Sequence, residues 1–372
     1  MIATNYPVNA ISRPLPNSNH KAKKILVALS GGVDSAVSAA LLKERGFIVV
    51  GVFFDLGNWG NKGLKNARKI ANKLDIPLKI VDARKEFKKK IIDYFVDSYK
   101  KSITPNPCVV CNREMKFDLL FGLLKKYGAD YIATGHYARI KVRPFPSPTI
   151  RREIPQGRTL WEAKDKTKDQ SYFLYRLTQK ELSKIIFPLG GYKKTETKKL
   201  AKKFKLPILG NEESQDICFL ADKSINLFLR KYTKPKPGNI IDENGKSLGE
   251  HQGLPFYTIG QRKGIEIGGT GPYFVVKKNL RKNELVVSDD PKKLLTKKFQ
   301  VQNVNWISKS LKFPSRAKVQ IRYHSPQISA NIKLGKAGRL IVETKKSLRA
   351  VTPGQSAVFY KNGEVLGGGI II

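Results

Sequence analysis

The chain has 372 residues, and its 70 Lys and Arg against 30 Asp and Glu give a formal net charge of +40 at pH 7. The length predicts two or three domains, and the lack of an apolar run of about 18 residues argues against a membrane-spanning helix. The charge favours a polyanionic partner such as nucleic acid, although lysine occurs in every segment and a general compositional bias would give the same balance. Three cysteines are too few, and odd in number, for a secreted disulfide framework.

The first 23 residues are expected to form a disordered tail. They contain Pro7, Pro14 and Pro16 and lack the apolar core of a secretion signal. Together with the low number of cysteines, this favours a cytoplasmic location, where the reducing environment leaves a thiol available for chemistry.

Residues 24–139 alternate between strand-like and helix-like patterns. Strands are expected at 25–29, 47–54, 78–81 and 131–134, and helices at 36–45, 64–74, 87–100 and 115–127. This alternation predicts βαβ units that form a parallel sheet with helices on both faces. Ligands of such sheets lie at the carboxyl ends of the strands, so we expect an ATP site where these residues follow strand ends: Ser30, Phe54, Asp82 and Gly135.

The most informative short motif is Ser30–Ser35, with the sequence Ser-Gly-Gly-Val-Asp-Ser between a strand and a helix. Paired glycines let backbone N–H groups approach phosphate oxygens, and the helix N-terminus adds partial positive charge. Asp34 is expected to cap the helix or to hold Mg²⁺. The motif matches neither a Walker A loop nor a Rossmann loop. It resembles the PP-loop of the ATP pyrophosphatase superfamily, which cleaves ATP between the α and β phosphates.

The second informative segment is Thr104–Asn112, which contains Cys108 and Cys111. Its prolines stiffen the approach to a helix that is expected to start near Arg113. Cys111 would then lie at a helix N-terminus beside an arginine, and both features favour the reactive thiolate.

The third cysteine, Cys218, has acidic neighbours that would oppose a thiolate, although a more acidic persulfide would tolerate them: Glu212, Glu213 and Asp216. The three cysteines leave several interpretations open. They could be a zinc half-site, which lacks a second ligand pair, or a thioredoxin-like dithiol, which needs a different surrounding pattern. They could also hold an iron–sulfur cluster, or be three inert buried thiols.

The rest of the chain divides by composition. Residues 141–160 are predicted as a loop, 171–205 as helical and 210–222 as irregular. From residue 235 onward short strands are expected, with tight hairpins at Asn244–Gly245 and Asn362–Gly363. The predicted domains are a tail at 1–23, a PP-loop catalytic domain at 24–222, a central β-rich domain at 223–285 and a C-terminal β-barrel at 286–372.

Taken together, these segments resemble the tRNA-specific 2-thiouridylase family, known in bacteria as the MnmA family. The matching segments run over nearly the whole chain past residue 24: Ser30–Ser35, Thr104–Asn112, Ala133–Arg139, Lys168–Phe173, Gln215–Phe219, Gly249–Gly253, Tyr257–Gly264, Arg322–Tyr323 and Thr352–Gln355. The resemblance implies an α/β fold class: a parallel-sheet PP-loop domain (adenine nucleotide alpha hydrolase-like), then a small central β-rich domain and a C-terminal β-barrel that binds tRNA.

The resemblance implies a tRNA-uridine 2-sulfurtransferase that thiolates the wobble uridine of the tRNA anticodon. ATP, with Mg²⁺, would adenylate the C2 oxygen, releasing pyrophosphate and later AMP. Cys218 would carry the sulfur as a persulfide, and Cys111 would be the nucleophile that releases it and closes a Cys111–Cys218 disulfide. The expected partners are tRNA and a persulfide sulfur carrier or cysteine desulfurase. The enzyme is expected to be monomeric and to need no membrane.

The resemblance also assigns binding residues. The ATP-binding positions would be Ala28, Leu29, Ser30, Gly31, Gly32, Val33, Asp34, Ser35, Phe54 and Gly135. The target-base loop would be Asn106, Pro107 and Cys108, and the tRNA contacts would be His136, Lys168, Asp169, Gln170, Arg322, Tyr323 and Gln355.

Cys108 departs from the family pattern, because many members have an acidic residue there. The departure puts a carboxylate acid–base role in doubt and keeps an iron–sulfur cluster in view. The alternatives are therefore cluster-dependent tRNA thiolation through Cys108, Cys111 and Cys218, another PP-loop tRNA-modifying ligase, or a non-catalytic RNA-binding protein.

Overall fold

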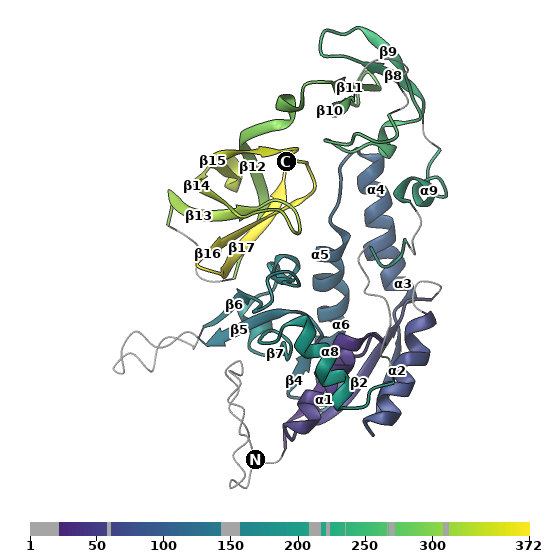
Figure 1. The fold of residues 1–372 in the computed structure, drawn as a ribbon, viewed down its shortest axis with the longest axis vertical. Helices are drawn as coiled ribbons and strands as arrows, with labels where there is room; N and C mark the ends of the chain where they lie inside the picture. The colour runs from purple at the N-terminus through teal and green to yellow at the C-terminus, as the bar shows by residue number, and fades with distance from the viewer. Residues whose placement is uncertain are drawn as a thin grey trace.

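The computed structural model describes residues 22–57, 61–142, 157–207, 217–220, 224–234, 236–265, 267, 272–307 and 312–372. The molecule is elongated, with a parallel-sheet domain at one end, a four-stranded sheet at the other and a β-barrel beside the middle (Figure 1). Helix α5 (Pro107–Cys111), which carries two of the cysteines, lies between the barrel and helix α4 (Tyr94–Lys100) (Figure 1).

The parallel sheet has the strand order β3-β2-β1-β4-β7, and every neighbouring pair is parallel. Its strands are β1 (Lys24–Ala28), β2 (Ile48–Asp55), β3 (Leu78–Asp82), β4 (Tyr131–Ala133) and β7 (Ile185–Ile186). The central strand β1 is apolar and buried along its middle, as expected for a strand covered on both faces. The first four strands lie where the sequence predicted them, with each end within one residue.

The helices begin earlier than predicted. They are α1 (Val33–Glu44), α2 (Asn61–Lys73), and two longer helical stretches that each contain a π-helical turn. The first stretch runs through α3 (Arg84–Phe87), η2 (Lys88–Asp93) and α4; the second runs through α5, η3 (Asn112–Phe117) and α6 (Asp118–Tyr127). The second stretch therefore starts at Pro107 rather than near Arg113, because Asn106 and Pro107 supply an N-cap and a first helical residue.

Two sequence predictions between residues 138 and 205 are wrong. The segment 171–205 is not continuously helical: it contains η5 (Ser171–Leu174), α7 (Gln179–Leu182), the strand β7 and α8 (Lys194–Lys203). The pair Ile185–Ile186 is too short to show a strand period, yet it is buried and extends the sheet by pairing with β4. The ends of the predicted loop 141–160 belong to an antiparallel pair, β5 (Ala138–Val142) and β6 (Arg158–Glu162), and residues 143–156 lie outside the described part of the chain.

The C-terminal region forms a closed antiparallel barrel. Its strands are β12 (Leu295–Trp306), β13 (Ser315–Gln320), β14 (Ile328–Leu334), β15 (Leu340–Arg349), β16 (Ser356–Lys361) and β17 (Glu364–Ile371). They pair in the order β12-β15-β14-β13-β16-β17, and a β12–β17 pairing closes the ring. The predicted hairpin at Asn362–Gly363 joins β16 and β17, with both residues at positive φ. Strand β6 adds to β17, so two strands that precede α8 extend the barrel sheet.

The middle region holds the sheet β10-β11-β8-β9. Its strands are β8 (Gly238–Ile241), β9 (Ser247–His251), β10 (Phe274–Asn279) and β11 (Glu284–Ser288), and the predicted turn at Asn244–Gly245 connects β8 to β9. One apolar core joins this sheet to α3, α4 and the short helix α9 (Ile225–Leu229), through side chains such as Phe95, Phe228 and Ile240. The predicted α/β fold class with a central β-rich region and a C-terminal barrel is confirmed, while the domain boundaries stay predictions.

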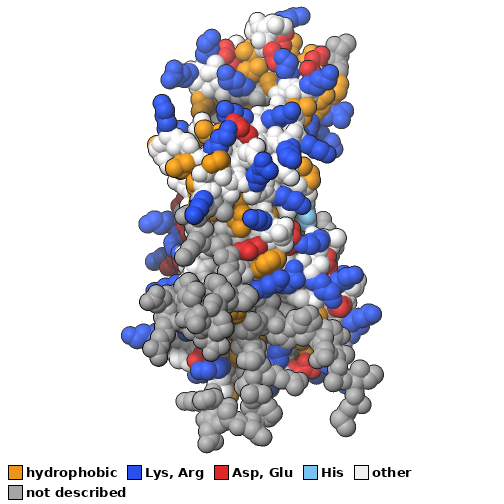
Figure 2. Space-filling model, turned by 90° about the vertical axis from the view of Figure 1, so that its left-hand side faces the viewer, with side chains coloured by type: hydrophobic (Ala, Val, Ile, Leu, Met, Phe, Trp, Pro, Cys, Tyr) orange, Lys and Arg blue, Asp and Glu red, His pale blue; other side chains and the backbone are white. Residues whose placement is uncertain are grey.

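Basic side chains are spread over the described part of the face in Figure 2 and do not gather in one stripe. No helix among the described residues is both long and apolar enough to cross a membrane.

Candidate functional site

The predicted pyrophosphate loop turns sharply from β1 into α1. Gly31 has φ +84°, a conformation that favours glycine, and Gly32 is the N-cap of α1 without a side-chain cap. The Ser35 hydroxyl donates to the Gly32 carbonyl at 2.9 Å, and the Ser30 and Ser35 hydroxyls lie 3.3 Å apart. The loop therefore presents backbone N–H groups and two hydroxyls at a helix N-terminus, which is the arrangement that binds phosphate.

Two other glycines let neighbouring backbone approach this loop. A Cβ on Gly135, just after β4, would lie 2.9 Å from backbone atoms of Asp34 and Ser35. A Cβ on Gly63 in α2 would lie 2.6 Å from the Ser30 carbonyl oxygen. Gly135 was predicted in the ATP site and lies against the loop, whereas Gly63 was missed because its role depends on packing between elements distant in sequence.

Asp34 has different partners from those predicted. Both of its carboxylate oxygens accept from the Lys194 ammonium, at 2.6 and 2.7 Å, and one also accepts from the Tyr137 hydroxyl at 2.9 Å. The prediction that Asp34 caps α1 is wrong, since the N-cap Gly32 receives no side-chain cap and Asp34 points toward α8. Sequence reasoning missed Lys194, which is only 8% exposed, because one lysine among many in 193–203 gives no signal.

The other strand ends lie along the same edge of the sheet. Phe54, near the end of β2, is half-buried and packs against two core clusters. Asp82 ends β3, and hydrogen bonds from Arg84 hold the pKa of its carboxyl well below the usual value. The sheet edge beside the pyrophosphate loop therefore carries the aromatic side chain of Phe54 and the Asp82–Arg84 ion pair.

The cysteine helix places its thiols in an apolar environment. Asn106 is its N-cap and accepts from the Val109 N–H, Pro107 is its first residue, and Cys111 is the last residue of α5 before η3 continues the helix. The expectation that Cys111 lies at a helix N-terminus is therefore wrong. Burial raises the pKa of the Cys111 thiol to about 11 and that of the Cys108 thiol to about 12.

The structure places the three cysteines within electrostatic range of one another. The charge of Cys218 acts on the pKa values of both Cys108 and Cys111, although the three residues are separated by up to 110 positions (218 − 108). Cys218 is exposed as a residue, but protein around its sulfur still raises its thiol pKa. The neighbours Glu212, Glu213 and Asp216, predicted to oppose a thiolate, lie outside the described residues. Within the described residues no group of three or more His, Cys, Asp or Glu side chains is arranged to hold a metal ion.

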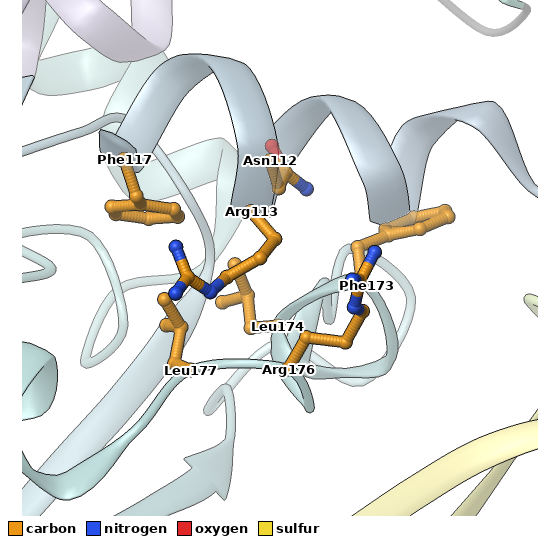
Figure 3. Close-up of a pocket in the computed structure, with 7 residues that line it drawn as sticks. All are labelled: Asn112, Arg113, Phe117, Phe173, Leu174, Arg176 and Leu177. Carbon is orange, nitrogen blue, oxygen red and sulfur yellow. The ribbon is translucent and has the colours of Figure 1, made fainter. Parts of the chain in front are cut away.

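Arg113, the predicted partner of the Cys111 thiolate, points away from the thiols. Its guanidinium pairs with Asp118 and, at 3.0 Å, with Glu181. It lines a narrow hollow between η3 and the segment around η5, where Figure 3 shows Arg113 and Arg176 reaching into the gap. The hollow has no room for a water molecule, so it is a packed seam and not a ligand site.

The segment Lys168–Gln170 is folded against the turn between β4 and β5. The Gln170 side chain accepts from the Tyr137 N–H at 3.0 Å, and the Gln170 N–H donates to the Tyr137 carbonyl. Asp169 accepts from the Ala163 N–H at 2.7 Å and from the Ser171 hydroxyl, while burial raises its pKa to about 6. Lys168 is half-buried in the same turn.

Tyr323, just beyond β13, connects the barrel to this segment. Its ring centroid lies 4.4 Å from that of Phe173, and burial, with the charges of Asp169 and Cys108, raises its pKa to about 12. The structure thus brings together predicted tRNA-binding and target-base residues from three separate segments.

Three other predicted tRNA contacts have partners inside the protein. His136 is buried, faces Phe117 at 6.1 Å, and accepts or donates at Nδ1 with the Thr134 hydroxyl at 2.7 Å. Arg322 donates to the Ala350 carbonyl and the Thr352 hydroxyl, both at 2.7 Å. Gln355 donates to the carbonyl oxygens of residues 104 and 105, at 3.1 and 3.0 Å, so the barrel holds the segment that leads into the target-base loop. Their contact with tRNA stays a prediction.

The turn from residue 134 to 137 links the two candidate centres. Gly135 contacts the pyrophosphate loop, His136 packs on Phe117 of η3, and the Tyr137 hydroxyl donates to Asp34. The nucleotide loop and the cysteine helix are therefore neighbours joined by one short segment.

Family models match nearly the whole chain. A tRNA methyl transferase HUP domain matches residues 23–222, a tRNA methyl transferase PRC-barrel domain matches 226–289, and an aminomethyltransferase beta-barrel domain matches 296–371. The tRNA-specific 2-thiouridylase MnmA of Carboxydothermus hydrogenoformans is 40% identical over 375 residues, covering 94% of this chain and 97% of the relative. The chain belongs to the tRNA-specific 2-thiouridylase family.

Other members of the family are similarly close. The tRNA-specific 2-thiouridylase MnmA of Chloroflexus aurantiacus is 41% identical, covering 93% of this chain and 98% of the relative. Among solved structures, an NMN synthetase from Francisella tularensis is 17% identical with a TM-score of 0.33, covering 53% of this chain and 68% of that one. A 4-thiouridine synthetase–RNA complex with bound ATP is 18% identical with a TM-score of 0.34, covering 56% of this chain and 50% of that one. The predicted membership in the 2-thiouridylase family is confirmed by the sequence relatives.

Proposed function

We propose that this 2-thiouridylase replaces the C2 oxygen of the wobble uridine of tRNA with sulfur, at the expense of ATP. The observation that carries the proposal is the placement of the pyrophosphate loop and the cysteine helix on either side of the turn at 134–137. A carbonyl oxygen is a poor leaving group, and adenylation converts it into one that a sulfur nucleophile can displace. A nucleotide loop next to thiols serves this sequence of steps.

In the first step, the N–H groups of Ser30–Ser35 bind the pyrophosphate part of ATP, and Lys194 lies close enough to the loop to offset phosphate charge. The C2 oxygen attacks the α phosphorus, the bond between the α and β phosphates breaks, and pyrophosphate leaves. The residues present do not fit a Mg²⁺ ion held by Asp34, because both of its carboxylate oxygens already accept from Lys194. We therefore assign no step to the predicted Mg²⁺.

In the second step, the terminal sulfur of a Cys218 persulfide attacks C2, and AMP leaves with the former C2 oxygen. The Cys111 thiolate then attacks the Cys218 sulfur. The sulfur–sulfur bond to the nucleotide breaks, its electron pair stays on the new 2-thiouridine, and Cys111 and Cys218 form a disulfide. An external thiol reduces the disulfide for the next cycle. The electrostatic coupling between the two thiols supports their action as a pair.

The barrel and the segment at 168–170 are proposed to hold the tRNA, with Tyr323 and Lys168 near the target-base loop at 106–108. Flipped bases commonly stack on aromatic side chains, and the packing of Tyr323 on Phe173, with Cys108 near enough for its charge to act on the Tyr323 pKa, supports that role. We propose that a persulfide carrier or a cysteine desulfurase supplies the sulfur. We also propose that the enzyme acts as a monomer in the cytoplasm.

The experiment is incubation of the full chain with ATP, a persulfide donor and bulk tRNA, followed by mass analysis of the nucleosides. We expect 2-thiouridine derivatives, with AMP and pyrophosphate released. The variant Asp34→Ala should abolish AMP release and leave tRNA binding largely intact. The variant Cys218→Ser should block thiolation from the persulfide donor, and thiolation at the wild-type rate would remove Cys218 as the carrier.

The same variants distinguish the alternative functions. Another PP-loop ligase would keep its activity when Cys111 and Cys218 are replaced by serine, and a non-catalytic RNA-binding protein would not need an intact pyrophosphate loop. A cluster-dependent enzyme would show iron–sulfur absorption after anaerobic purification and would use sulfide as donor.

A further inference from the structure

The proposed function needs ionised thiols, whereas the apolar environment of the cysteines favours the protonated form. Burial raises the pKa of the Cys111 thiol to about 11 even though the charge of Lys116 lowers it, so little of this thiol is ionised at pH 7. Nucleophilic attack needs the thiolate, and each sulfur-transfer step leaves negative charge on a sulfur atom in an apolar environment. A cation beside the sulfur atoms would stabilise this negative charge, and Arg113 is paired with carboxylates elsewhere.

Lys116 is placed to supply that charge. It lies five residues after Cys111 in the π-helical segment η3, where hydrogen bonds join residues five positions apart, so the two side chains start one turn from each other. Its ammonium donates to the Asn112 side-chain oxygen at 3.1 Å, and Asn112 is itself 4% exposed. This anchor uses one of the three N–H donors of the ammonium.

The charged and titratable groups around the thiols come from several elements. Among the described residues, Lys116 is the one cation whose charge acts on all three thiols. It also acts on His136, which burial keeps neutral because its pKa is lowered well below the usual value. On the barrel side, Tyr323 interacts with Cys108 and with Asp169. In the part of the chain that the structure describes, no other cation acts on the pKa values of these thiols.

We propose that the Lys116 ammonium, held by Asn112, is the positioning residue that stabilises anionic sulfur on Cys111 and Cys218 during transfer. The role lies outside the residues that the family resemblance assigns, and it rests on the proposed function for its use. In the same π-helical segment, Arg113 faces the seam of Figure 3, whereas the Lys116 ammonium bonds to Asn112, the residue directly after Cys111.

The test measures ionisation without ATP or tRNA, so its failure is distinguishable from failure of the proposed function. Cys111 is isolated in a Cys108→Ser/Cys218→Ser background, and its alkylation by iodoacetamide is followed by mass spectrometry between pH 7 and 9. Because an opposite charge nearby lowers a pKa by about one to three units, Lys116→Met should slow alkylation at least roughly tenfold at every pH. Lys116→Arg keeps the charge and should stay within about threefold of the parent.

The matched control is Lys90→Met, which removes a lysine that also contacts η3, donating to the Glu114 carbonyl at 3.0 Å. It should leave the alkylation rates unchanged. Equal rates in the parent and in a folded Lys116→Met variant would overturn the proposal. Should Lys116→Met fail to fold, Lys116→Gln preserves a donor for Asn112 and must show the same slowing. Failure of both variants to fold would assign Lys116 a structural role and would also overturn it.

Discussion

Replacing Lys194 with methionine tests how the pyrophosphate loop is held. The ammonium lies 2.6 and 2.7 Å from the two Asp34 oxygens, and its removal leaves the carboxylate with the Tyr137 hydroxyl as a described donor. Breaking a buried pair costs about 3–5 kcal/mol, whereas an exposed pair contributes about 0–1 kcal/mol. The Lys194 side chain is 9% exposed and that of Asp34 is 33% exposed, so we expect an intermediate loss of about 2 kcal/mol.

The assay is thermal unfolding of the full chain, followed through the transition of the parallel-sheet domain. At roughly 2–4 °C per kcal/mol for a domain of this size, Lys194→Met should lower Tm by about 4–8 °C. It should also weaken nucleotide binding about tenfold, because a cation next to the phosphates is lost.

The control is the double variant Lys194→Met/Asp34→Asn, which removes the unpaired charge together with its partner. It should recover most of the lost Tm while still binding nucleotide weakly, since the loop regains its packing but not its cation. A double variant as unstable as Lys194→Met would show that the cost comes from lost packing, and the electrostatic reasoning would be refuted. An unchanged Tm in the single variant would refute it as well.

Three further predictions concern the loop, the barrel contact and pH. Gly135→Ala should abolish ATP-dependent AMP release, because its Cβ would lie 2.9 Å from the backbone of the pyrophosphate loop. The control is Gly122→Ala in α6, which has open space around it. It should leave AMP release unchanged and change the free energy of unfolding by between zero and about 1 kcal/mol in the stabilising direction. Gln355→Ala removes two hydrogen bonds to the segment just before the target-base loop, so hydrogen exchange at the backbone N–H groups of residues 103, 104 and 106 should speed up severalfold with barrel amides unaffected. Asp169 has a pKa of about 6 in the folded protein, above its unfolded value, so it binds its proton more tightly when folded. The free energy of unfolding should therefore fall as pH rises from about 4 to 6. Asp169→Asn should remove this pH dependence in urea titrations, and an unchanged pH dependence would exclude Asp169 as its source.

The sequence predicted the parallel sheet well because its signals are local. Apolar runs that contain isoleucine and valine mark β1 and β2, and the glycine pair after β1 marks the loop. The strand β7 was missed for the opposite reason, since two isoleucines have no period and their strand identity comes from pairing with β4. The same holds for β5 and β6, whose pairing with the barrel depends on contacts 200 residues away in sequence (364 − 161 = 203 for the pair Trp161 and Glu364).

The sequence predicted the separate motifs of the site but not the side chains that pair with them. The motif residues at 30–35 and 106–111 were found from residue type and spacing, but their charge partners were not. Lys194 meets Asp34 across 160 residues, and no pattern in a lysine-rich chain singles it out. The helix start at Pro107 had a local signal, because asparagine followed by proline is typical of an N-cap and a first helical residue. A prediction based on this asparagine–proline pair would have put Cys111 inside a helix and not at its N-terminus.

The turn at 134–137 gives a physical reason for a nucleotide site and a thiol site to act in order. Tyr137 donates through its hydroxyl to Asp34, while its backbone is bound to Gln170 of the proposed tRNA-binding segment. One residue earlier, His136 packs on Phe117, one position after Lys116 in η3. A shift of the loop when phosphate binds would therefore act on the cysteine helix and on the 168–170 segment through the same four residues. Because the packed interior resists gradual deformation, such a link favours a coupled rearrangement over independent motion of the two sites.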